Sequence, residues 1–398
     1  MKTNSFRKLI ISLISCLALG AFAVDPTVSD VMVRQRWPWD RQVDIEYKLN
    51  CGDPNSEAYI RIDLYNGSET APLGIPLDSL SGDLYKVKEG FRHIVWDPFK
   101  TGYTNAPAME LRVTVTPTTP PLYVIVDLTQ SAGATNQIAY VYPGDARLET
   151  YDKWTNVWFG VTNDTLYKTK TDKLVLRRVP AGAFKTGEYP PATPAVIEKD
   201  FYAGVFTVTE AQWYKVMAGT PANPTKPKLG VTYNEIRGST NNVPPIDYPA
   251  ITPFISPTNF LGVLRAKTGI GTFNLPTSIE WEYLCRAGTT SYFNDGTSTS
   301  ASDTTQLSEV GWWIGNCSAM PEVGGKAANC WGIYDTLGSV YEWCMTLVTR
   351  TTLNDARVVR GGSYISSAAN NRVAYVANSL PDNSTTFYGF RLVMTLPK

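Results

Sequence analysis

The residue types that carry redox and metal chemistry are scarce in this chain of 398 residues, which has a single histidine, His93, and six cysteines. The cysteines are Cys16, Cys51, Cys285, Cys317, Cys330 and Cys344. Their spacings differ from those of zinc sites, so structural or spare thiols are favoured over metal ligands. The five cysteines beyond Cys16 are an odd number. In an oxidising compartment at least one thiol therefore stays free or pairs with another chain.

Two further patterns resemble catalytic ones but have a simpler structural explanation. Glu280 and Glu282 lie two residues apart on a predicted helix, and such neighbours do not share a face. We expect one to be a capping or solvent carboxylate and the other a buried hydrogen-bond acceptor. Arg360-Gly361-Gly362-Ser363 lacks the remaining residues of a phosphate-binding loop, which favours a tight turn.

The N-terminus predicts export. Lys2, Arg7 and Lys8 form a basic segment before an apolar stretch, and Ala21-Phe22-Ala23 fits a cleavage site. Residues 1–23 are therefore expected to be a signal peptide of a secreted or periplasmic protein. Lipoprotein anchoring at Cys16 is the alternative.

The composition argues against two classes of partner. The 36 basic and 36 acidic residues cancel, so no net field would recruit nucleic acid or an anionic membrane. No later stretch approaches about 18 apolar residues, so no membrane span is expected. Aromatic residues reach 12%, which is typical of loop-rich folds in which Trp and Tyr fill the spaces between elements.

Residues 24–118 predict a small β-sandwich. Apolar and polar residues alternate in segments 43–49, 60–65 and 111–115, which is the period of strands with one buried face. No helical stretch separates these segments. His93 lies in a similar segment and is expected to be a packed or surface residue.

A proline-rich stretch, Pro117 to Pro121, marks the predicted end of this module. Residues 119–172 are expected to form a connector that docks on its neighbours, with one strand candidate at 123–126. From residue 173 to 398 turns predominate. The clear helical signals there are Thr209 before 210–217, and Thr277 before 278–286 with Gly288 as a stop.

Six segments of the C-terminal half occur in a recognisable order. They are residues 179–187, 206–213, 273–288, 331–343, 360–364 and 389–391. In this order they resemble the sulfatase-modifying factor domain, the family of the formylglycine-generating enzyme. The resemblance implies an α+β chain whose C-terminal domain has an irregular fold related to C-type lectins. The N-terminal part is similar to Ig/fibronectin-like β-sandwich modules found before such domains.

The resemblance also implies a chemistry that this chain lacks the residues to perform. The family's oxidase holds copper(I) between two cysteines just after the Arg-Gly-Gly-Ser segment, and thiolates suit that ion. Here residues 364–372 contain no cysteine, and Ser366 occupies the first position. No catalytic residue and no copper are therefore expected. Cys285 and Cys344 are better explained by a disulfide or by inert burial. The histidine-dependent iron branch is excluded because His93 lies outside this domain.

A calcium site is a further implication of the resemblance. The family binds calcium through oxygens around a Gly-Asn-x-Trp-Glu motif, and the matching residues are Gly338, Val340 and Glu342. Ser339 and Tyr341 depart from that motif. The alternative is that Glu342 accepts hydrogen bonds from nearby backbone without any ion.

Three functions remain open on this basis. The first is a ligand-binding module, because lectin-like folds use their C-terminal loops and these are rich in Tyr, Asn and Ser. The expected contact residues are Tyr364, Ser366, Asn370, Asn371, Tyr375, Asn378, Asn383 and Tyr388. The ligand would be an extracellular protein, peptide or glycan. The alternatives are an active formylglycine-generating oxidase and a purely structural secreted component.

Overall fold

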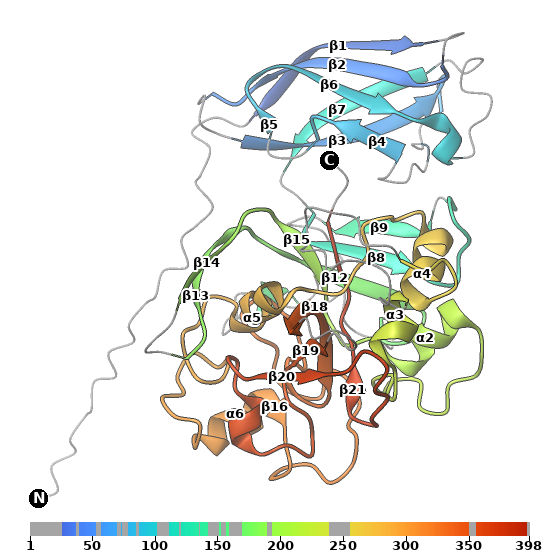
Figure 1. Ribbon diagram of the computed structural model, residues 1–398. Coiled ribbons are helices and arrows are strands. Elements are labelled where there is room, and N and C mark those ends of the chain that lie inside the picture. The colour runs from blue at the N-terminus through green and yellow to red at the C-terminus, as the bar shows by residue number, and fades with distance from the viewer. Residues whose placement is uncertain are drawn as a thin grey trace, which may run out of the picture.

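The structure is a computed structural model with two parts, an all-β N-terminal part and a mixed C-terminal part (Figure 1). It describes residues 26–36, 40–52, 57–69, 73, 79–84, 87–101, 111–118, 121–134, 136–141, 151–152, 157–158, 169–188, 193–238, 255–349 and 356–395. The predicted signal peptide 1–23, with Cys16, lies outside these residues. Within them, no helix is long and apolar enough to cross a membrane.

The N-terminal part is a β-sandwich of two antiparallel sheets, with strand orders β1-β2-β6-β4 and β5-β3-β7. Its strands are β1 (Thr27–Gln35), β2 (Val43–Asn50), β3 (Glu57–Asn66), β4 (Leu80–Gly82), β5 (Val87–Lys88), β6 (Gly90–Trp96) and β7 (Leu111–Thr118). A 3-10 turn, η2 (Pro98–Thr101), follows β6. The predicted alternation is confirmed in β2, where Val43, Ile45, Tyr47 and Leu49 are all buried in the shared core.

A five-stranded sheet with the order β22-β15-β12-β8-β9 forms one layer of the C-terminal part. Its strands are β8 (Tyr123–Asp127), β9 (Ile138–Val141), β12 (Lys173–Val179), β15 (Phe201–Gly204) and β22 (Val393–Met394). Two of these strands come from residues 119–172, the segment predicted as a connector. A short ladder, β10 (Tyr151–Asp152) with β11 (Val157–Trp158), comes from the same segment. The structural unit therefore begins before residue 173.

Shorter sheets make up most of the remainder. A four-stranded sheet contains β18 (Tyr341–Thr349), β19 (Ala356–Arg360), β20 (Val376–Ser379) and β21 (Tyr388–Gly389) in the order β20-β19-β18-β21. Two-stranded ladders join β13 (Gly182–Thr186) to β14 (Thr193–Ile197) and β16 (Gly311–Trp312) to β17 (Leu337–Gly338). β20 is an edge strand of the four-stranded sheet, so the loops before and after it lie at the edge of that sheet.

The helices are short and are α2 (Glu210–Met217), α3 (Tyr233–Arg237), α4 (Phe260–Thr268), α5 (Ser278–Arg286) and α6 (Thr304–Val310), with a 3-10 turn η5 (Ala368–Asn371). Both predicted helices have the predicted bounds, and Thr209 and Thr277 are their N-caps in complete capping boxes. The predicted stop at Gly288 is displaced by one residue, because Ala287 already adopts the left-handed conformation at φ 46°.

Aromatic side chains fill the space between these elements. Trp213 of α2 stacks on Phe260 of α4 with ring centroids 4.8 Å apart, and Phe390 meets the Phe260 ring edge-on at 5.1 Å. This arrangement follows from the composition, since short elements leave gaps that only large flat side chains can fill.

Candidate functional site

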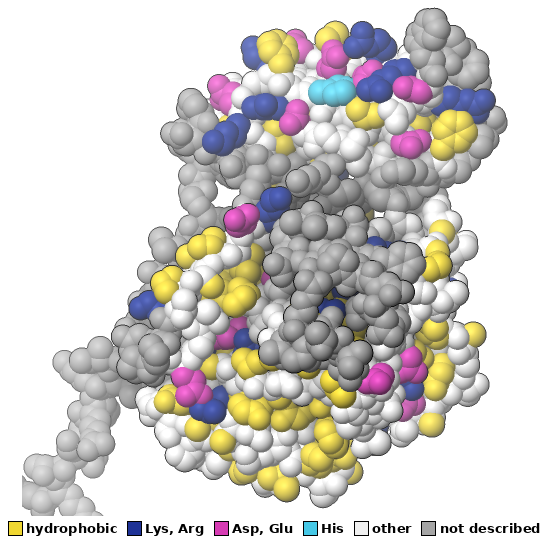
Figure 2. Space-filling model, in the orientation of Figure 1, with side chains coloured by type: hydrophobic (Ala, Val, Ile, Leu, Met, Phe, Trp, Pro, Cys, Tyr) yellow, Lys and Arg dark blue, Asp and Glu magenta, His cyan; other side chains and the backbone are white. Residues whose placement is uncertain are grey.

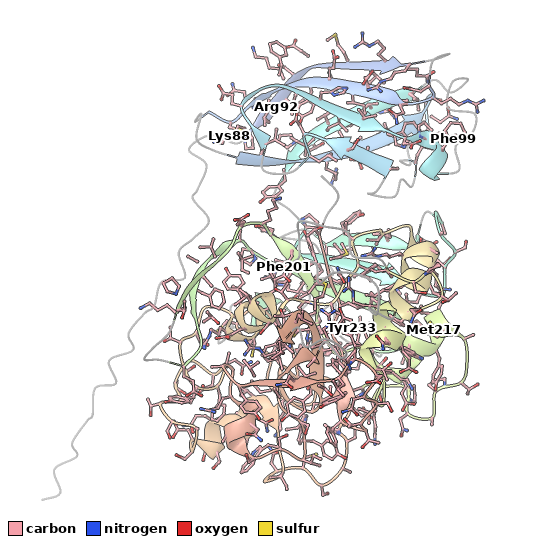
Figure 3. The ribbon with its side chains drawn as sticks, viewed as in Figure 1. Lys88, Arg92, Phe99, Phe201, Met217 and Tyr233 are labelled. Atoms are coloured by element: carbon pink, nitrogen blue, oxygen red, sulfur yellow. The ribbon has the colours of Figure 1, made fainter. Side chains whose placement is uncertain are left out.

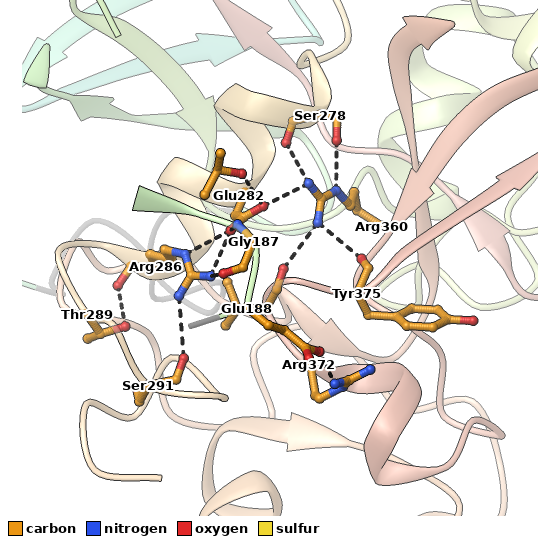
Figure 4. Close-up of polar contacts among 12 residues, drawn as sticks. Gly187, Glu188, Ser278, Glu282, Arg286, Thr289, Ser291, Arg360, Arg372 and Tyr375 are labelled. Atoms are coloured by element: carbon orange, nitrogen blue, oxygen red, sulfur yellow. Dashed lines mark hydrogen bonds and ion pairs between the residues drawn. The ribbon is translucent and has the colours of Figure 1, made fainter. Parts of the chain in front are cut away.

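A buried carboxylate, Glu282 of α5, joins the elements beneath the candidate ligand surface (Figure 4). Arg286 Nη2 lies 2.7 Å from one carboxylate oxygen, and Arg360 Nη2 lies 2.9 Å from the other. Thr186 Oγ1 and the Gly187 amide donate to the same carboxylate at 2.8 and 2.7 Å. Burial alone would raise the pKa of Glu282, but the attraction of the two arginines holds it below its usual range. The prediction of a buried acceptor is confirmed.

Glu280 has the other predicted role, that of a capping carboxylate. It accepts hydrogen bonds from the Thr277 amide at 2.8 Å and from the Thr277 hydroxyl at 3.0 Å. Burial raises the pKa of Glu280 to about 7. Because Glu280 and Glu282 are engaged with different partners, they do not form an acid–base pair.

Arg360, which pairs with Glu282, also contacts the loops after β19. Its Nη1 donates to the carbonyls of Val373 and Tyr375 at 3.3 and 3.1 Å, which fixes the chain just before β20. Gly362 follows at φ 74°, and a Cβ at this position would lie 1.7 Å from Asn371 Oδ1. The segment is therefore a tight turn that requires glycine, as predicted, and not a phosphate-binding loop.

The Ser366 hydroxyl, at the position of the family's first thiol, closes this turn. Its Oγ accepts a hydrogen bond from the Ser363 amide at 3.1 Å and lies 2.8 Å from Ser363 Oγ. It also donates to Tyr341 Oη at 3.4 Å. The Ser366 carbonyl accepts from the Ile314 amide at 3.1 Å, which ties the loop after β16 to this point. Ser366 thus has a structural role within the loops.

Tyr341 lies half-buried at the centre of the same loops. Its ring meets the Tyr388 ring edge-on with centroids 6.0 Å apart. Burial raises the pKa of Tyr341 above its ordinary value, and the hydrogen bond from Ser366 lowers it only partly. The phenol therefore remains protonated at neutral pH and can donate a hydrogen bond.

The predicted ligand-binding residues fall into three groups. Asn378 and Asn383 are exposed, and Tyr364, Ser366, Asn370 and Tyr375 are half-buried. Asn371 and Tyr388, which are predicted to form part of the ligand surface, are buried. The Tyr388 ring packs on Trp343 with centroids 5.0 Å apart, and Asn371 Nδ2 donates to the Ser363 carbonyl at 3.5 Å. Both residues position the loops from beneath.

Two exposed isoleucines belong to this surface but were not predicted from the sequence. Ile314 is 61% exposed and Ile365 is 45% exposed, and the hydrogen bond between Ile314 and Ser366 holds their loops together. Figure 2 shows hydrophobic side chains gathered on the part of the molecule where Figure 1 places α6, β16 and β20. The sequence offers no periodic signal for them, because both lie in irregular loops.

The cysteines do not replace the missing thiols. Cys285 and Cys344 are fully buried in one apolar cluster with Trp281 and Phe293. Burial raises the pKa of Cys285 to about 12 and raises that of Cys344 as well, so neither supplies a thiolate at neutral pH. Among the residues that the structure describes, no group of three or more His, Cys, Asp or Glu side chains could hold a metal ion.

Glu342, one of the expected calcium ligands, is already paired with an arginine. Its two oxygens lie 3.1 Å from Arg391 Nε and 2.7 Å from Arg391 Nη2. Trp281 Nε1 also donates to it at 2.6 Å. Its partners are therefore side chains, which corrects the alternative that it accepts from nearby backbone.

An uncompensated acidic oxygen lies instead on Asp335, a residue absent from the sequence predictions although it stands three residues before Gly338. Asp335 Oδ2 accepts from the Gly324 amide, whereas Oδ1 has no hydrogen-bond partner among the described residues. Burial raises the pKa of Asp335 to about 6. Oxygen ligands suit calcium, and Asp335 Oδ1 is a buried carboxylate oxygen without a hydrogen-bond partner among the described residues, while Glu342 remains with its arginine.

Comparison with known proteins identifies the family of the C-terminal part. A family model described as sulfatase-modifying factor enzyme 1-like domain matches residues 162–396. The chaperone protein LppX of Paenibacillus barcinonensis is 30% identical over 241 residues, which cover 52% of this chain and 84% of that protein.

Similar solved structures include Treponema denticola variable protein 1, with 23% identity and a TM-score of 0.42. The match covers 56% of this chain and 95% of that one. PvdO from Pseudomonas aeruginosa shares 19% identity with a TM-score of 0.43, over 56% of this chain and 94% of its own.

Proposed function

This chain belongs to the sulfatase-modifying factor enzyme 1-like domain family, and from that membership we propose that it is a non-catalytic, ligand-binding member. The observation that carries the proposal is the position of Ser366. Its hydroxyl stands where the oxidase would need a thiol and is engaged by Ser363 and Tyr341. A hydroxyl is a poor ligand for copper(I), and the buried thiols Cys285 and Cys344 are protonated.

The chemistry of the loops supports binding. The surface combines tyrosine and asparagine side chains with the exposed Ile314 and Ile365, so it offers hydrogen bonds beside apolar contact area. The ion pair between Arg372 and Glu188 lies beside it, and the other residues named here are uncharged. A neutral segment of an extracellular protein, a peptide or a glycan fits such a surface. One relative of this chain is named as a chaperone protein.

Location outside the cytoplasm is part of the proposal. Residues 1–23 have the sequence of an export signal, so the ligand would be met in the periplasm or in the medium. Fusion of these residues to a reporter enzyme that works only after export tests this point. A reporter that stays inactive would contradict it.

An assay for formylglycine tests the absence of oxidase activity. The mature chain is reconstituted with copper(I) and incubated in air with a cysteine-bearing sulfatase peptide, and the product is read by mass spectrometry. No conversion is expected beside an active formylglycine-generating enzyme. Conversion would overturn the proposal, and replacing Cys285 and Cys344 in turn would then identify the thiols involved.

Binding is tested with a glycan array and a displayed-peptide library. Ile314→Glu and Ile365→Glu each place a charge in the apolar part of the surface and are expected to abolish retention of any selected glycan or peptide. Val196→Glu is the matched control, because Val196 is 63% exposed but lies on the β13–β14 hairpin. Equal loss in all three variants would contradict a site in the C-terminal loops.

A structural calcium ion is the second element of the proposal. It would be held by Asp335 and by the carbonyls of Gly338 and Val340, and it would stabilise the turn before β18. Millimolar calcium is expected to raise the thermal unfolding midpoint of the wild type but not that of Asp335→Asn. An equal rise in both proteins would place any calcium elsewhere.

A further inference from the structure

Two buried arginines of the C-terminal part have no carboxylate partner among the residues that the structure describes. Arg237 is 6% exposed and Arg357 is 5% exposed. Among the described residues neither forms an ion pair, whereas the equally buried Arg286, Arg360 and Arg391 each pair with a glutamate. Burying an unpaired charge costs several kcal/mol, on the order of the penalty for any ion removed from water. The two exceptions therefore require an explanation.

The free edge of Arg237 is the edge that other arginines of this chain use to bind carboxylates. Arg391 holds Glu342 through Nε and Nη2 at 3.1 and 2.7 Å, and Arg36 holds Asp44 through the same two atoms at 2.9 and 2.7 Å. In Arg237, Nε and Nη2 are buried and have no hydrogen-bond partner among the described residues. A bidentate donor pair of this kind matches two oxygens of a carboxylate or phosphate group.

Arg357 packs against the same tyrosine ring as Arg237. Its Cζ lies 4.7 Å from the centre of the Tyr233 ring, and Arg237 Cζ lies 5.8 Å from the same point (Tyr233 is labelled in Figure 3). Arg237 Nη1 donates to Tyr233 Oη at 2.7 Å, and Arg357 Nη1 donates to the Met345 carbonyl at 2.7 Å. Within the described part of the chain, Arg357 Nε has no hydrogen-bond partner, like the Nε and Nη2 atoms of Arg237.

The tyrosine ring compensates these charges only in part. A cation over an aromatic ring gains less than burial of two guanidinium groups costs. A phenol and one carbonyl are neutral acceptors and leave both positive charges in place. The component that the described residues do not supply is negative charge.

We propose that Arg237 and Arg357 form a binding site for a small oxyanion of the carboxylate or phosphate class, between the end of α3 and the start of β19. The anion accepts two hydrogen bonds from the Nε and Nη2 atoms of Arg237, and Arg357 on the same tyrosine adds positive charge nearby. This site is separate from the candidate surface around Ser366 and does not depend on the proposed function.

Anion-dependent stability of the mature chain tests the site. Because both side chains are buried, the protein is refolded into acetate, phosphate or sulfate at matched ionic strength, with chloride as the reference. At least one oxyanion is expected to raise the thermal unfolding midpoint with saturation. If none of the three stabilises the wild type beyond chloride, the proposal is wrong.

Arg237→Lys keeps the charge but removes the bidentate edge, so it is expected to weaken the apparent affinity by about tenfold or more. The matched control is Arg34→Lys, a surface arginine of β1, which should bind as the wild type does. Wild-type affinity in Arg237→Lys would overturn the assignment.

A direct location of the anion needs no variant. Crystals of the wild type grown in selenate should show an anomalous selenium peak within hydrogen-bond reach of Arg237 Nε and Nη2. Selenium peaks only at other positions would contradict the proposal, even if oxyanions stabilise the protein.

Discussion

Two ion pairs, one from each part of the molecule, lie in different environments. In the N-terminal sandwich, the side chains of Arg34 and Glu46 pair at the surface and remain 70% and 39% exposed. In the C-terminal part, Arg391 and Glu342 pair in the interior with exposures of 0% and 1%. The same two residue types thus contribute to a surface in one part and to a core in the other.

The difference follows from how each part satisfies its backbone. In the sandwich the strands pair along most of their length, so the ladders satisfy the peptide groups. The C-terminal part has short elements, and its arginines take over that role. Arg391 Nη1 donates to the carbonyls of Gly204 and Val205 at 2.7 and 3.0 Å, and its Nη2 donates to that of Tyr334 at 2.7 Å. Buried ion pairs here are a consequence of irregular backbone.

Removal of a buried carboxylate is expected to give the largest contrast between the two parts. Glu342→Gln should lower the free energy of unfolding by about 3–5 kcal/mol, because Arg391 is left buried without its counter-ion. Glu46→Gln in the sandwich is the matched control and should cost less than about 1 kcal/mol. Urea titrations followed by tryptophan fluorescence measure both. Similar losses would contradict the comparison.

The ionisation of Asp335 in the C-terminal part is expected to make protein stability depend on pH. Burial raises the folded-state pKa of Asp335 to about 6 from its ordinary value of 3.8, so the folded state binds this proton more tightly. The contribution of protonated Asp335 to the free energy of unfolding is complete below about pH 4. It is lost as the pH rises through 6, and the loss is up to about 3 kcal/mol. Urea unfolding in the presence of a chelator, across this pH range, should show the loss.

Asp335→Asn is expected to remove the part of the pH dependence of the unfolding free energy that Asp335 causes. Asparagine tolerates the positive φ of 56° at this position, which makes the variant a clean one. Burial raises the pKa of Glu280 to about 7, so Glu280 also lowers the free energy of unfolding as the pH rises. Some pH dependence should therefore remain in the variant. An unchanged slope in Asp335→Asn would refute the assignment.

Asp44 in the sandwich should respond with the opposite sign. The hydrogen bond from Arg36 lowers the pKa of Asp44 to about 2, so its contribution is present above about pH 4 and is lost as the pH falls through 2. Since the Arg36 side chain is one-third exposed, solvent screening limits the effect to about 1–2 kcal/mol. Hydrogen exchange of β2 and β6 between pH 4 and 2 measures it. Asp44→Asn should show no such loss.

The smallest expected effect concerns backbone strain at the end of α5. Ala287 has a φ of 46°, which costs an alanine energy that glycine does not incur. Ala287→Gly should therefore raise the free energy of unfolding by about 1 kcal/mol. Ala211→Gly, inside α2, is the control and should lower it by about 1 kcal/mol. A loss in both variants would mean that Ala287 is not strained.

Sequence reasoning was most successful where the signal is local. Alternation identified β2, and the capping residues Thr209 and Thr277 gave the bounds of α2 and α5. The position of Ser366 after the Arg-Gly-Gly-Ser turn was also readable, because the family motif fixes it within a few residues.

Local signals did not distinguish a loop residue that faces solvent from one that faces the core. Asn371 and Tyr388 have the same residue types as Asn378, which is exposed, and Tyr375, which is half-buried, yet they are buried. The pairing of β8 with β12 likewise joins segments about fifty residues apart, so the predicted connector gave no sign of the sheet that it enters.

The sequence by itself determined the family, the strand and helix signals and the absence of a thiol at position 366. The tertiary structure decided which charges are paired. Glu282 meets Arg360 across 78 residues, Arg391 reaches Glu342 across 49, and Arg237 reaches no carboxylate among the described residues. Periodicity and capping act over a few residues, whereas burial and charge pairing depend on contacts between segments that are distant in the chain.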